Sequence, residues 1–371
     1  MNISESRYDR AERITWWDQS LLKSSRVLVV GAGALGNEIV KNLTLVGVGQ
    51  IDVVDMDTIE HSNLSRCVFF RDGDEGKSKA ELLVSRARDL NPDVELTAYQ
   101  SAVQELGSAF LSRYSLVIGA LDNREARLWT SRACRLNGLL FIDAAIEGLH
   151  AVVRIFEPDK ACYACTLSEI DWQVLNKRRS CALLQRDDIV QGKTPTNATT
   201  SSLASAIQVQ ECIKHLVGKT ELVALRGKAW HLMGEELASF VVELSEDPNC
   251  MEHFDIKDHI EIEFSGSKTL NDVLAPFLDS GEIWTLDDFV YIDHCHQGHL
   301  KPVAGFRSLL SSSQAICSVC ETELSIQSVS MLSADFPGMN LPADSLVIPK
   351  SEYLIHTSNS TTTAIAIRNG E

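Results

Sequence analysis

The stretch Arg26-Val-Leu-Val-Val-Gly31-Ala-Gly33-Ala-Leu-Gly36 decides the fold that the sequence predicts. Its first five residues are typical of a buried strand, and the glycines form a turn that opens a helix over about residues 35–46. Glycines let the backbone approach a phosphate, and a helix N-terminus offers free N–H groups. The pattern predicts a nucleotide site, but it fits ATP and a dinucleotide such as NAD equally well.

Short apolar runs and longer amphipathic runs alternate through the first half of the chain. Such alternation implies parallel strands with helices on both faces, so we expect a doubly wound, Rossmann-like α/β fold with a mainly parallel sheet. Asn91-Pro92 ends a helix predicted over residues 77–90. The remaining strands are predicted over residues 50–54, 94–99, 115–120, 139–144, 151–156 and 238–244, and a further helix over residues 200–217.

The composition is that of a globular protein of 371 residues, 44% of them apolar, with a formal net charge of -17. This charge argues against a nucleic-acid partner held by phosphate contacts, because such domains are usually basic. No run of about 18 apolar residues predicts a membrane span, and the N-terminus lacks the apolar core of a signal peptide. We therefore predict a cytoplasmic location, where the ten cysteines serve as thiols or metal ligands.

Four short motifs follow the glycine turn in a fixed order. They are Asp55-Met-Asp57, Asn63-Leu-Ser-Arg66, Gly76-Lys-Ser-Lys79 and Asn91-Pro92. This ordered set resembles the ubiquitin-activating superfamily of ThiF-type adenylyltransferases, which includes the bacterial enzymes that activate sulfur carriers for thiamine and molybdenum-cofactor synthesis. The resemblance covers roughly residues 7–253. It implies that ATP adenylates the C-terminal carboxylate of a ubiquitin-like or sulfur-carrier protein.

The resemblance assigns a role to each motif. Asp55 would bind the ribose, Arg66 and Lys79 the triphosphate, and Asp122 would hold Mg²⁺ and the reacting groups, since carboxylate oxygens suit a hard cation. Arg127 matches the family pattern more loosely, and Cys67 stands where the family often has glutamine. The residues expected to bind the nucleotide are Gly31, Gly33, Gly36, Asp55, Asp57, Asn63 and Asn123.

Two further residues matter for assembly and for chemistry after adenylation. Arg10, in Arg7-Tyr-Asp-Arg10, matches an arginine that reaches the phosphates across a dimer interface in the bacterial enzymes, which implies a homodimer. Cys181 falls in the superfamily's crossover loop, and the basic residues 177–179 would favour its thiolate. Cys181 could carry a thioester on the way to a downstream acceptor or conjugating protein, carry a persulfide, or have no catalytic role.

The same resemblance sets the expected domains. A ThiF-type adenylation domain would cover residues 1–254, with its crossover loop at about 166–199. Residues 255–371 would form a smaller C-terminal domain of mixed character, which ends in an apolar alternation.

The remaining cysteines suggest two zinc sites. Cys162-Tyr-Ala-Cys165 is a zinc-type knuckle, and Cys250-Met-Glu-His253 stands where the superfamily has its second pair. Cys317-Ser-Val-Cys320 follows a His/Cys-rich stretch, as in a zinc ribbon with one cysteine replaced. There His299 and His296 compete for the fourth place, His299 being favoured because adjacent side chains chelate one ion poorly. The alternative is four unrelated core residues at the first place and buried thiols in a small domain at the second. The second set of candidate ligands is Cys295, His299, Cys317 and Cys320.

Two other classes of function also fit parts of the sequence. An NAD-dependent oxidoreductase would explain the glycine turn and Asp55, but it gives no reason for Arg66, Lys79 or Cys181. A non-catalytic scaffold of the same fold would be expected to lose some of Asp55, Arg66, Lys79 and Asp122, and all four are present.

Overall fold

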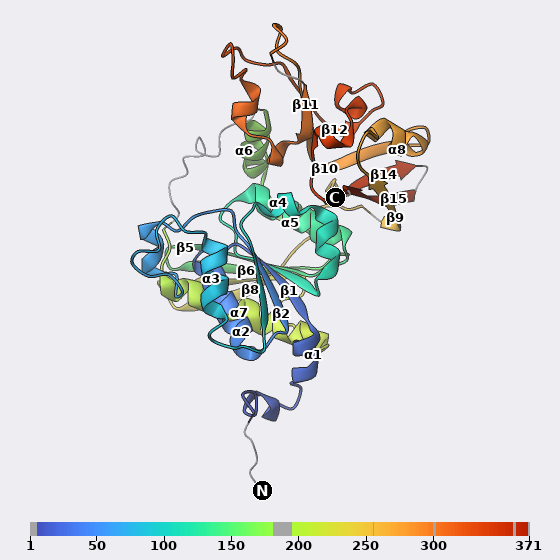
Figure 1. Cartoon of the computed structure of the whole chain (residues 1–371). Coiled ribbons are helices and arrows are strands. Elements are labelled where there is room, and N and C mark those ends of the chain that lie inside the picture. The colour runs from blue at the N-terminus through green and yellow to red at the C-terminus, as the bar shows by residue number, and fades with distance from the viewer. Residues whose placement is uncertain (1–5, 181–194, 255, 300–301, 359–360, 370–371) are drawn as a thin grey trace. The chain divides into compact units, whose positions relative to one another are not determined.

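A computed structural model describes residues 6–180, 195–254, 256–299, 302–358 and 361–369. These residues divide into two compact units. The first contains residues 6–103, 111–166 and 195–248, and the second contains residues 104–110, 167–180 and the described residues from 249 onward. Figure 1 colours the chain by residue number, from blue at the N-terminus to red at the C-terminus.

An eight-stranded sheet forms the centre of the first unit, with strand order β3-β2-β1-β4-β5-β6-β7-β8. Strands β1 to β5 are parallel, and β6 to β8 continue the sheet as an antiparallel meander. The mainly parallel, doubly wound prediction is therefore confirmed. The strands are β1 (Arg26–Val30), β2 (Gln50–Val54), β3 (Glu95–Tyr99), β4 (Leu116–Gly119), β5 (Phe141–Glu147), β6 (His150–Phe156), β7 (Lys228–Met233) and β8 (Ala238–Glu243).

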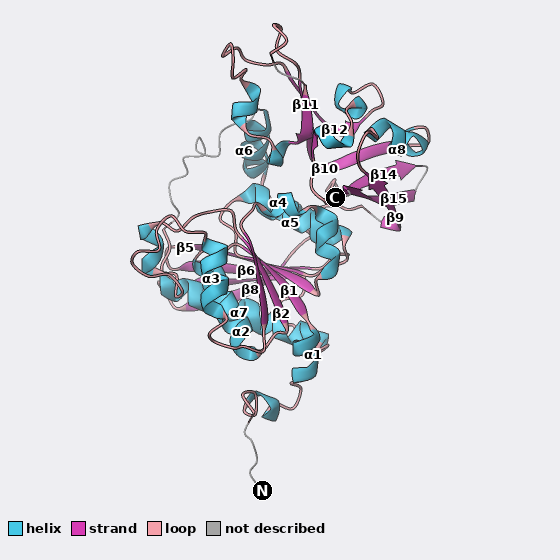
Figure 2. Ribbon diagram, viewed as in Figure 1, coloured by secondary structure: helices cyan, strands magenta, loops and turns pink. Residues whose placement is uncertain are grey.

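Helices cover both faces of this sheet (Figure 2). Helices α2, α3 and α7 pack together over one face, with a continuous apolar core beneath them, and α5 packs on β4 and β5. Right-handed crossovers place α2 and α3 on one side and α5 on the other, because the strand order reverses after β1. The helices are α1 (Gln19–Ser24), α2 (Ala34–Val46), α3 (Lys79–Ala87), α5 (Arg124–Leu136) and α7 (Ala198–Leu216), with short 3₁₀ turns η1 (Ala11–Arg13), η2 (His61–Ser65), η4 (Ala164–Thr166) and η6 (Thr220–Leu222).

Helix α3 is shorter than the predicted span of residues 77–90. It begins at Lys79 because the Ser78 side chain accepts the Glu81 N–H as an N-cap. It ends at Ala87, and the following residues turn into Asn91-Pro92. The sequence also failed to predict β7 and a helix over residues 169–180, within the expected crossover loop.

The second unit is built on a mixed sheet of seven strands, with β9 at one edge and β13 at the other. The C-terminal alternation forms β15, which pairs with β14 and, in parallel, with β9. Leu270 and Leu274 of α8 pack into its core. Residues 104–110 of this unit belong to α4 (Val103–Leu106) and η3 (Ser108–Arg113), each of which also includes residues of the first unit. The other elements are α6 (Glu169–Ser180), β9 (Ile256–Phe264), α8 (Leu270–Leu278), β10 (Glu282–Ile292), β11 (Val303–Phe306), η7 (Arg307–Leu309), η8 (Ser312–Ala315), β12 (Ile326–Leu332), η9 (Pro337–Asn340), η10 (Ala343–Ser345), β13 (Leu346–Val347), β14 (Ser351–Ser358) and β15 (Thr361–Asn369).

A buried carboxyl group anchors residues 104–110 to β14 inside this second unit. The Glu352 side chain is 3% exposed and accepts the Ser108 N–H at 3.2 Å and the Ser108 hydroxyl. Gly107 has a φ of +83°, and a Cβ there would lie 2.0 Å from the Ser351 carbonyl oxygen. Burial raises the pKa of Glu352 to about 8.

This raised pKa predicts a pH-dependent stability. The unfolded chain loses the Glu352 proton near its ordinary pKa of 4.5, whereas the folded chain keeps it to about 8. The contribution of Glu352 to the free energy of unfolding is therefore full below the unfolded pKa. It falls as pH rises toward the folded pKa, by on the order of 5 kcal/mol in total. Urea unfolding across that range should show this slope in the wild type and lose most of it in Glu352→Gln. The exposed Glu282→Gln variant should keep the wild-type slope, and an unchanged slope in Glu352→Gln would contradict the prediction.

None of the helices within the described ranges has the length and apolar character that a membrane span requires.

Candidate functional site: the carboxyl ends of β1, β2 and β4

The glycine turn lies where the strand order reverses, between the ends of β1 and β4, the usual place for a ligand in such sheets. Gly31 has a φ of +105°, and a Cβ there would lie 2.4 Å from the Ala120 carbonyl oxygen. A Cβ on Gly36 would lie 2.0 Å from the Gly31 carbonyl oxygen, so packing within the chain explains both glycines. A Cβ on Gly33 would meet no atom of the described residues within 4 Å. Gly33 therefore fits a turn that a phosphate approaches closely.

Asp55 follows β2 and contacts the glycine turn directly. Its carboxylate accepts the Ala32 N–H at 2.6 Å and the Asp57 N–H at 2.8 Å. Burial raises the pKa of Asp55, while the nearby Lys79 charge and these two N–H groups oppose the rise. Because two backbone N–H groups fix it, the carboxylate is held in one place beside the turn.

Lys79 opens α3 and points into the same group of acids. Its side chain is only 13% exposed, and Nζ lies 2.9 Å from Asp57 Oδ2. Burial lowers the pKa of Lys79, but the charges of Asp55, Asp57 and Asp122 outweigh it and raise the pKa overall. The structure thus brings these four predicted residues together as one charged cluster, in which the lysine stays cationic.

Arg66 and Asn63 lie on and just after η2. Asn63 is buried, and its side-chain oxygen accepts the Glu60 N–H at 3.0 Å, so it caps the turn. Arg66 donates from Nη1 to the Ser62 carbonyl at 2.5 Å, and no carboxylate of the described residues forms an ion pair with it. Arg66 is therefore a cation available to an anionic ligand. Burial raises the pKa of the Cys67 thiol to about 11, against the charges of Arg66 and Lys79, so Cys67 remains neutral.

Asp122 and Asn123 follow β4. Asp122 is exposed and accepts the Asn123 side-chain N–H at 3.3 Å. Asn123 caps α5, since its Oδ1 accepts the Ala126 N–H at 2.8 Å. The Asn123 side-chain oxygen is therefore already used as a helix cap and needs no ligand to explain its position. The Asp122 carboxylate, in contrast, lies at the surface near Lys79.

Arg10 belongs to a segment that lies, in its own chain, at the opposite end of the strands from the glycine turn. Arg7 donates to the Leu90 carbonyl at 2.8 Å, and the Tyr8 hydroxyl accepts from Asn91 at 2.8 Å, both near the start of β2. Figure 1 shows this blue segment at the α1 end of the sheet. The glycine turn instead bonds to the end of β2 at Val54. Five residues of strand, about 3.3 Å each, separate the two places.

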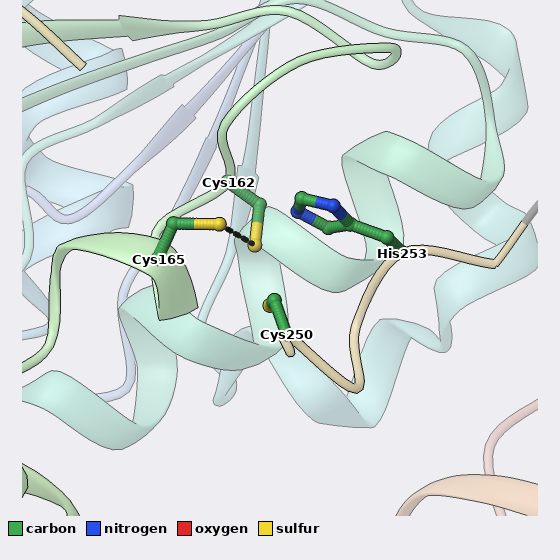
Figure 3. A group of neighbouring side chains, drawn as sticks. All are labelled: Cys162, Cys165, Cys250 and His253. Carbon is green, nitrogen blue, oxygen red and sulfur yellow. Dashed lines mark hydrogen bonds between the residues drawn. The ribbon is translucent and has the colours of Figure 1, made fainter. Parts of the chain in front are cut away.

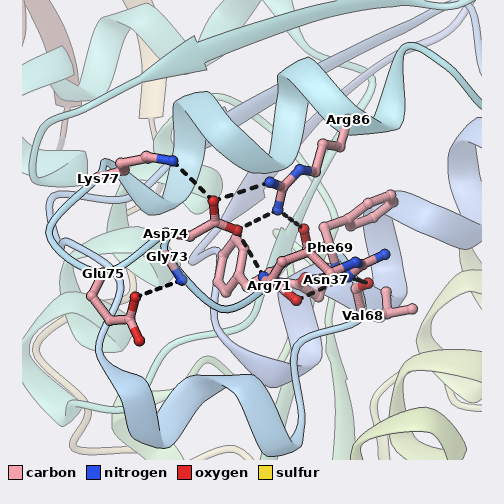
Figure 4. Close-up of polar contacts among 10 residues, drawn as sticks. Asn37, Val68, Phe69, Arg71, Gly73, Asp74, Glu75, Lys77 and Arg86 are labelled. Atoms are coloured by element: carbon pink, nitrogen blue, oxygen red, sulfur yellow. Dashed lines mark hydrogen bonds and ion pairs between the residues drawn. The ribbon is translucent and has the colours of Figure 1, made fainter.

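Two buried polar side chains that the sequence reasoning missed support this site. Asn37 donates to the carbonyls of Ala32 and Gly33 at 2.8 and 3.0 Å and accepts the Phe69 N–H at 3.0 Å. The Asp74 carboxylate accepts hydrogen bonds from the Arg86 and Lys77 side chains (Figure 4). The hydrogen bond from Arg86 lowers the pKa of Asp74. Together they fix the segment that carries Arg66. The one sequence signal for these supporting residues was the position of Asn37, a polar side chain within an otherwise apolar helix.

The first Cys/His tetrad, Cys162, Cys165, Cys250 and His253, is assembled as the spacing suggested (Figure 3). Its four ligand atoms all lie within 4.8 Å of one another, and Cys162 Sγ lies 3.8 Å from Cys165 Sγ. Two sulfurs on one tetrahedral zinc lie about 3.8 Å apart when each Zn–S bond is about 2.3 Å.

The second tetrad contains Cys295, His299, Cys317 and Cys320, again within 4.8 Å. His299 Nδ1 lies 3.9 Å from Cys295 Sγ and 3.8 Å from Cys317 Sγ. His299, rather than the competing His296, is therefore the histidine of this cluster. Both tetrads are consistent with zinc. Cys181 lies outside the described residues.

These features define the class of the protein: a doubly wound α/β protein with an acid-and-lysine cluster at the switch point and two Cys/His tetrads. The chain belongs to the ThiF family, whose model matches residues 8–252. It is 31% identical to the SAMP-activating enzyme E1 of Haloferax volcanii, a match covering 67% of this chain and 90% of that one.

Other relatives match over shorter stretches. The NEDD8-activating enzyme E1 catalytic subunit of Caenorhabditis elegans is 34% identical over 43% of this chain, which spans 41% of that subunit. Among solved structures, E. coli MccB with ATP has a TM-score of 0.56 at 22% identity, with 68% of this chain and 75% of that chain covered. This last likeness concerns the fold.

Proposed function

We propose that the chain uses ATP to adenylate the C-terminal carboxylate of a small ubiquitin-like or sulfur-carrier protein. The observation that carries this proposal is the Lys79 cluster, in which one lysine and three aspartates gather beside a glycine turn. The Haloferax volcanii relative, matched over most of its length, is by name an activating enzyme for SAMP.

The chemistry requires charge neutralisation and positioning more than proton transfer. A carboxylate oxygen of the partner forms a bond to the α-phosphorus of ATP, and the bond from that phosphorus to the bridging oxygen breaks, so pyrophosphate leaves with the electron pair. Lys79 and Arg66 bind the triphosphate, and Asp55 orients the ribose. Mg²⁺ held by Asp122 would supply further charge neutralisation of the phosphates.

This cluster favours adenylation over the alternative functions. Hydride transfer to NAD needs the glycine turn and Asp55, but it gives no task to a buried Lys79 or to an unpaired Arg66. A non-catalytic scaffold has no need to keep Lys79 cationic in a largely buried site.

ATP–pyrophosphate exchange with candidate β-grasp proteins ending in Gly-Gly tests the proposal. We expect exchange that depends on both the protein partner and Mg²⁺. An absorbance change of a nicotinamide cofactor, with no exchange for any partner, would refute adenylation.

We further propose that the activated carboxylate passes to Cys181, where the thiolate displaces AMP and forms a thioester. A non-reducing gel of wild type and Cys181→Ala should show an adduct only in the wild type. An adduct that persists in the variant, or exchange with no adduct in either protein, would exclude Cys181 as the acceptor.

We also propose that the chain acts as a homodimer in which Arg10 serves the partner's site. In its own chain Arg10 follows Arg7 and Tyr8, whose contacts lie at the end of the strands opposite to the glycine turn, so it is too far away to serve its own site. Arg10→Ala and Asp122→Asn should each be inactive alone. Co-expressed in one cell, they should recover about a quarter of the wild-type activity, because half of randomly paired dimers are mixed and each holds one intact site. Recovery would fail if Arg10 acted within its own chain.

A further inference from the structure

Arg127 on α5 is a buried arginine that holds the loop carrying Asp122. Its side chain is nearly buried, and the guanidinium donates to the Leu121 carbonyl and, at 2.9 Å, to the Ala144 carbonyl. A buried charge is unfavourable unless it is paired and hydrogen-bonded. Here the donors bind backbone oxygens that follow β4 and lie within β5, and so tie the loop to the neighbouring strand.

Asp143 on β5 fixes this guanidinium in turn. The carboxylate is fully buried, 3.5 Å from Arg127 Nη1 and 3.4 Å from Arg154 Nη1 on β6. Asp143 pairs with Gly119 on the neighbouring strand β4 and with Arg154 on the other neighbour, β6. Arg154 therefore shares the same carboxylate with Arg127 but approaches it from β6, away from the loop.

The Asp122 side chain has little else to orient it. It is exposed, and its hydrogen bond within the described residues comes from the Asn123 amide at 3.3 Å. Its direction is therefore set by the backbone on either side. Asn123 holds the following residue as the cap of α5, and Arg127 holds the preceding carbonyl through a charge-assisted hydrogen bond, which is stronger than a neutral one.

We infer that Arg127 is a positioning residue that keeps the Leu121–Asp122 peptide fixed, so that the Asp122 carboxylate stays beside Lys79. The inference rests on the proposed role of Asp122 in adenylation. Arg127 does not itself reach the phosphates, because its guanidinium is buried and both terminal nitrogens face groups inside the protein. The guanidinium places Nη2 on the two carbonyls and Nη1 opposite Asp143. Lysine has a single nitrogen, which cannot take both places at once.

Hydrogen exchange measured by mass spectrometry tests the positioning without any ligand. Arg127→Lys should speed amide exchange over residues 120–126 about tenfold, the effect of losing one charge-assisted hydrogen bond. Arg154→Lys is the matched control, because it alters the same Asp143 pair and should leave that segment unchanged. Equal protection in wild type and Arg127→Lys would overturn the inference.

ATP binding then tests whether Arg127 acts through Asp122. Arg127→Lys should weaken ATP binding with Mg²⁺ about tenfold and leave binding in EDTA unchanged. In an Asp122→Asn background the same change should add nothing, whereas additive losses would show that Arg127 acts elsewhere. A wild type that binds no ATP would refute the proposed function, and the exchange result would still decide whether Arg127 holds the loop.

Discussion

Lys79→Met should lower ATP–pyrophosphate exchange about a thousandfold, the upper range for removing one preorganised charge from a phosphoryl or acyl transition state. Lys79 is the cation at the centre of the acidic cluster, and its side chain is 13% exposed. Without it, Asp55, Asp57 and Asp122 would face the triphosphate with only Arg66 to offset them. We expect the loss mainly in kcat. The melting temperature should change little, because Asp57 remains half-exposed and solvated when its lysine partner is removed.

Lys77→Met is the matched control for this variant. Lys77 stands two residues earlier, its side chain is 55% exposed, and it pairs with Asp74 rather than with the cluster. Asp74 keeps its two hydrogen bonds from Arg86 when Lys77 is removed. Exchange in Lys77→Met should therefore stay near the wild-type rate. Comparable activity of the two lysine variants would remove the Lys79 cluster from the mechanism.

Local sequence signals predicted the elements that carry the nucleotide site. The apolar run of β1 and the glycines after it act within a few residues, so the strand, turn and helix could be read directly. Of the residues that the motif spacing assigned to the site, Asp55 and Asp57 follow β2, and Lys79 reaches Asp57 in the structure. The helix over residues 169–180 was missed because Leu175 is its only residue whose side chain is described as buried. A helix with so few apolar contacts has no amphipathic pattern to detect.

The residues that hold the site in place could not be read from the sequence. Asn37 and Arg127 bond to backbone groups 32 and 17 residues away, and Asp74 bonds to the Arg86 side chain, 12 residues away. Glu352 is a stronger case, since its partner Ser108 is 244 residues away. No short pattern encodes such contacts, because they exist only after the sheet has brought the segments together. The spacing of short motifs therefore predicts the residues that would face a ligand better than it predicts the residues that hold them in place.

The second large effect is expected on removal of metal from the Cys/His tetrads. We expect two zinc ions per chain, and one after Cys162→Ser or Cys317→Ser, measured by metal analysis of the purified protein. A closed four-ligand site is structural, and its binding free energy is part of the folding free energy, on the order of 10 kcal/mol in small zinc modules. Cys162→Ser should therefore lower the melting temperature strongly, and a strong chelator should do the same to the wild type.

The two neighbouring histidines of the second tetrad give this prediction its sharpest control. His299 Nδ1 stands within 4 Å of two sulfurs, whereas His296 is not among the four clustered ligands. His299→Ala should lose one zinc ion, and His296→Ala should keep both. If His299→Ala also kept two ions, His299 would not be a required ligand. A wild type that held no zinc after purification without chelators would show that the tetrads are clusters of thiols and histidine without metal.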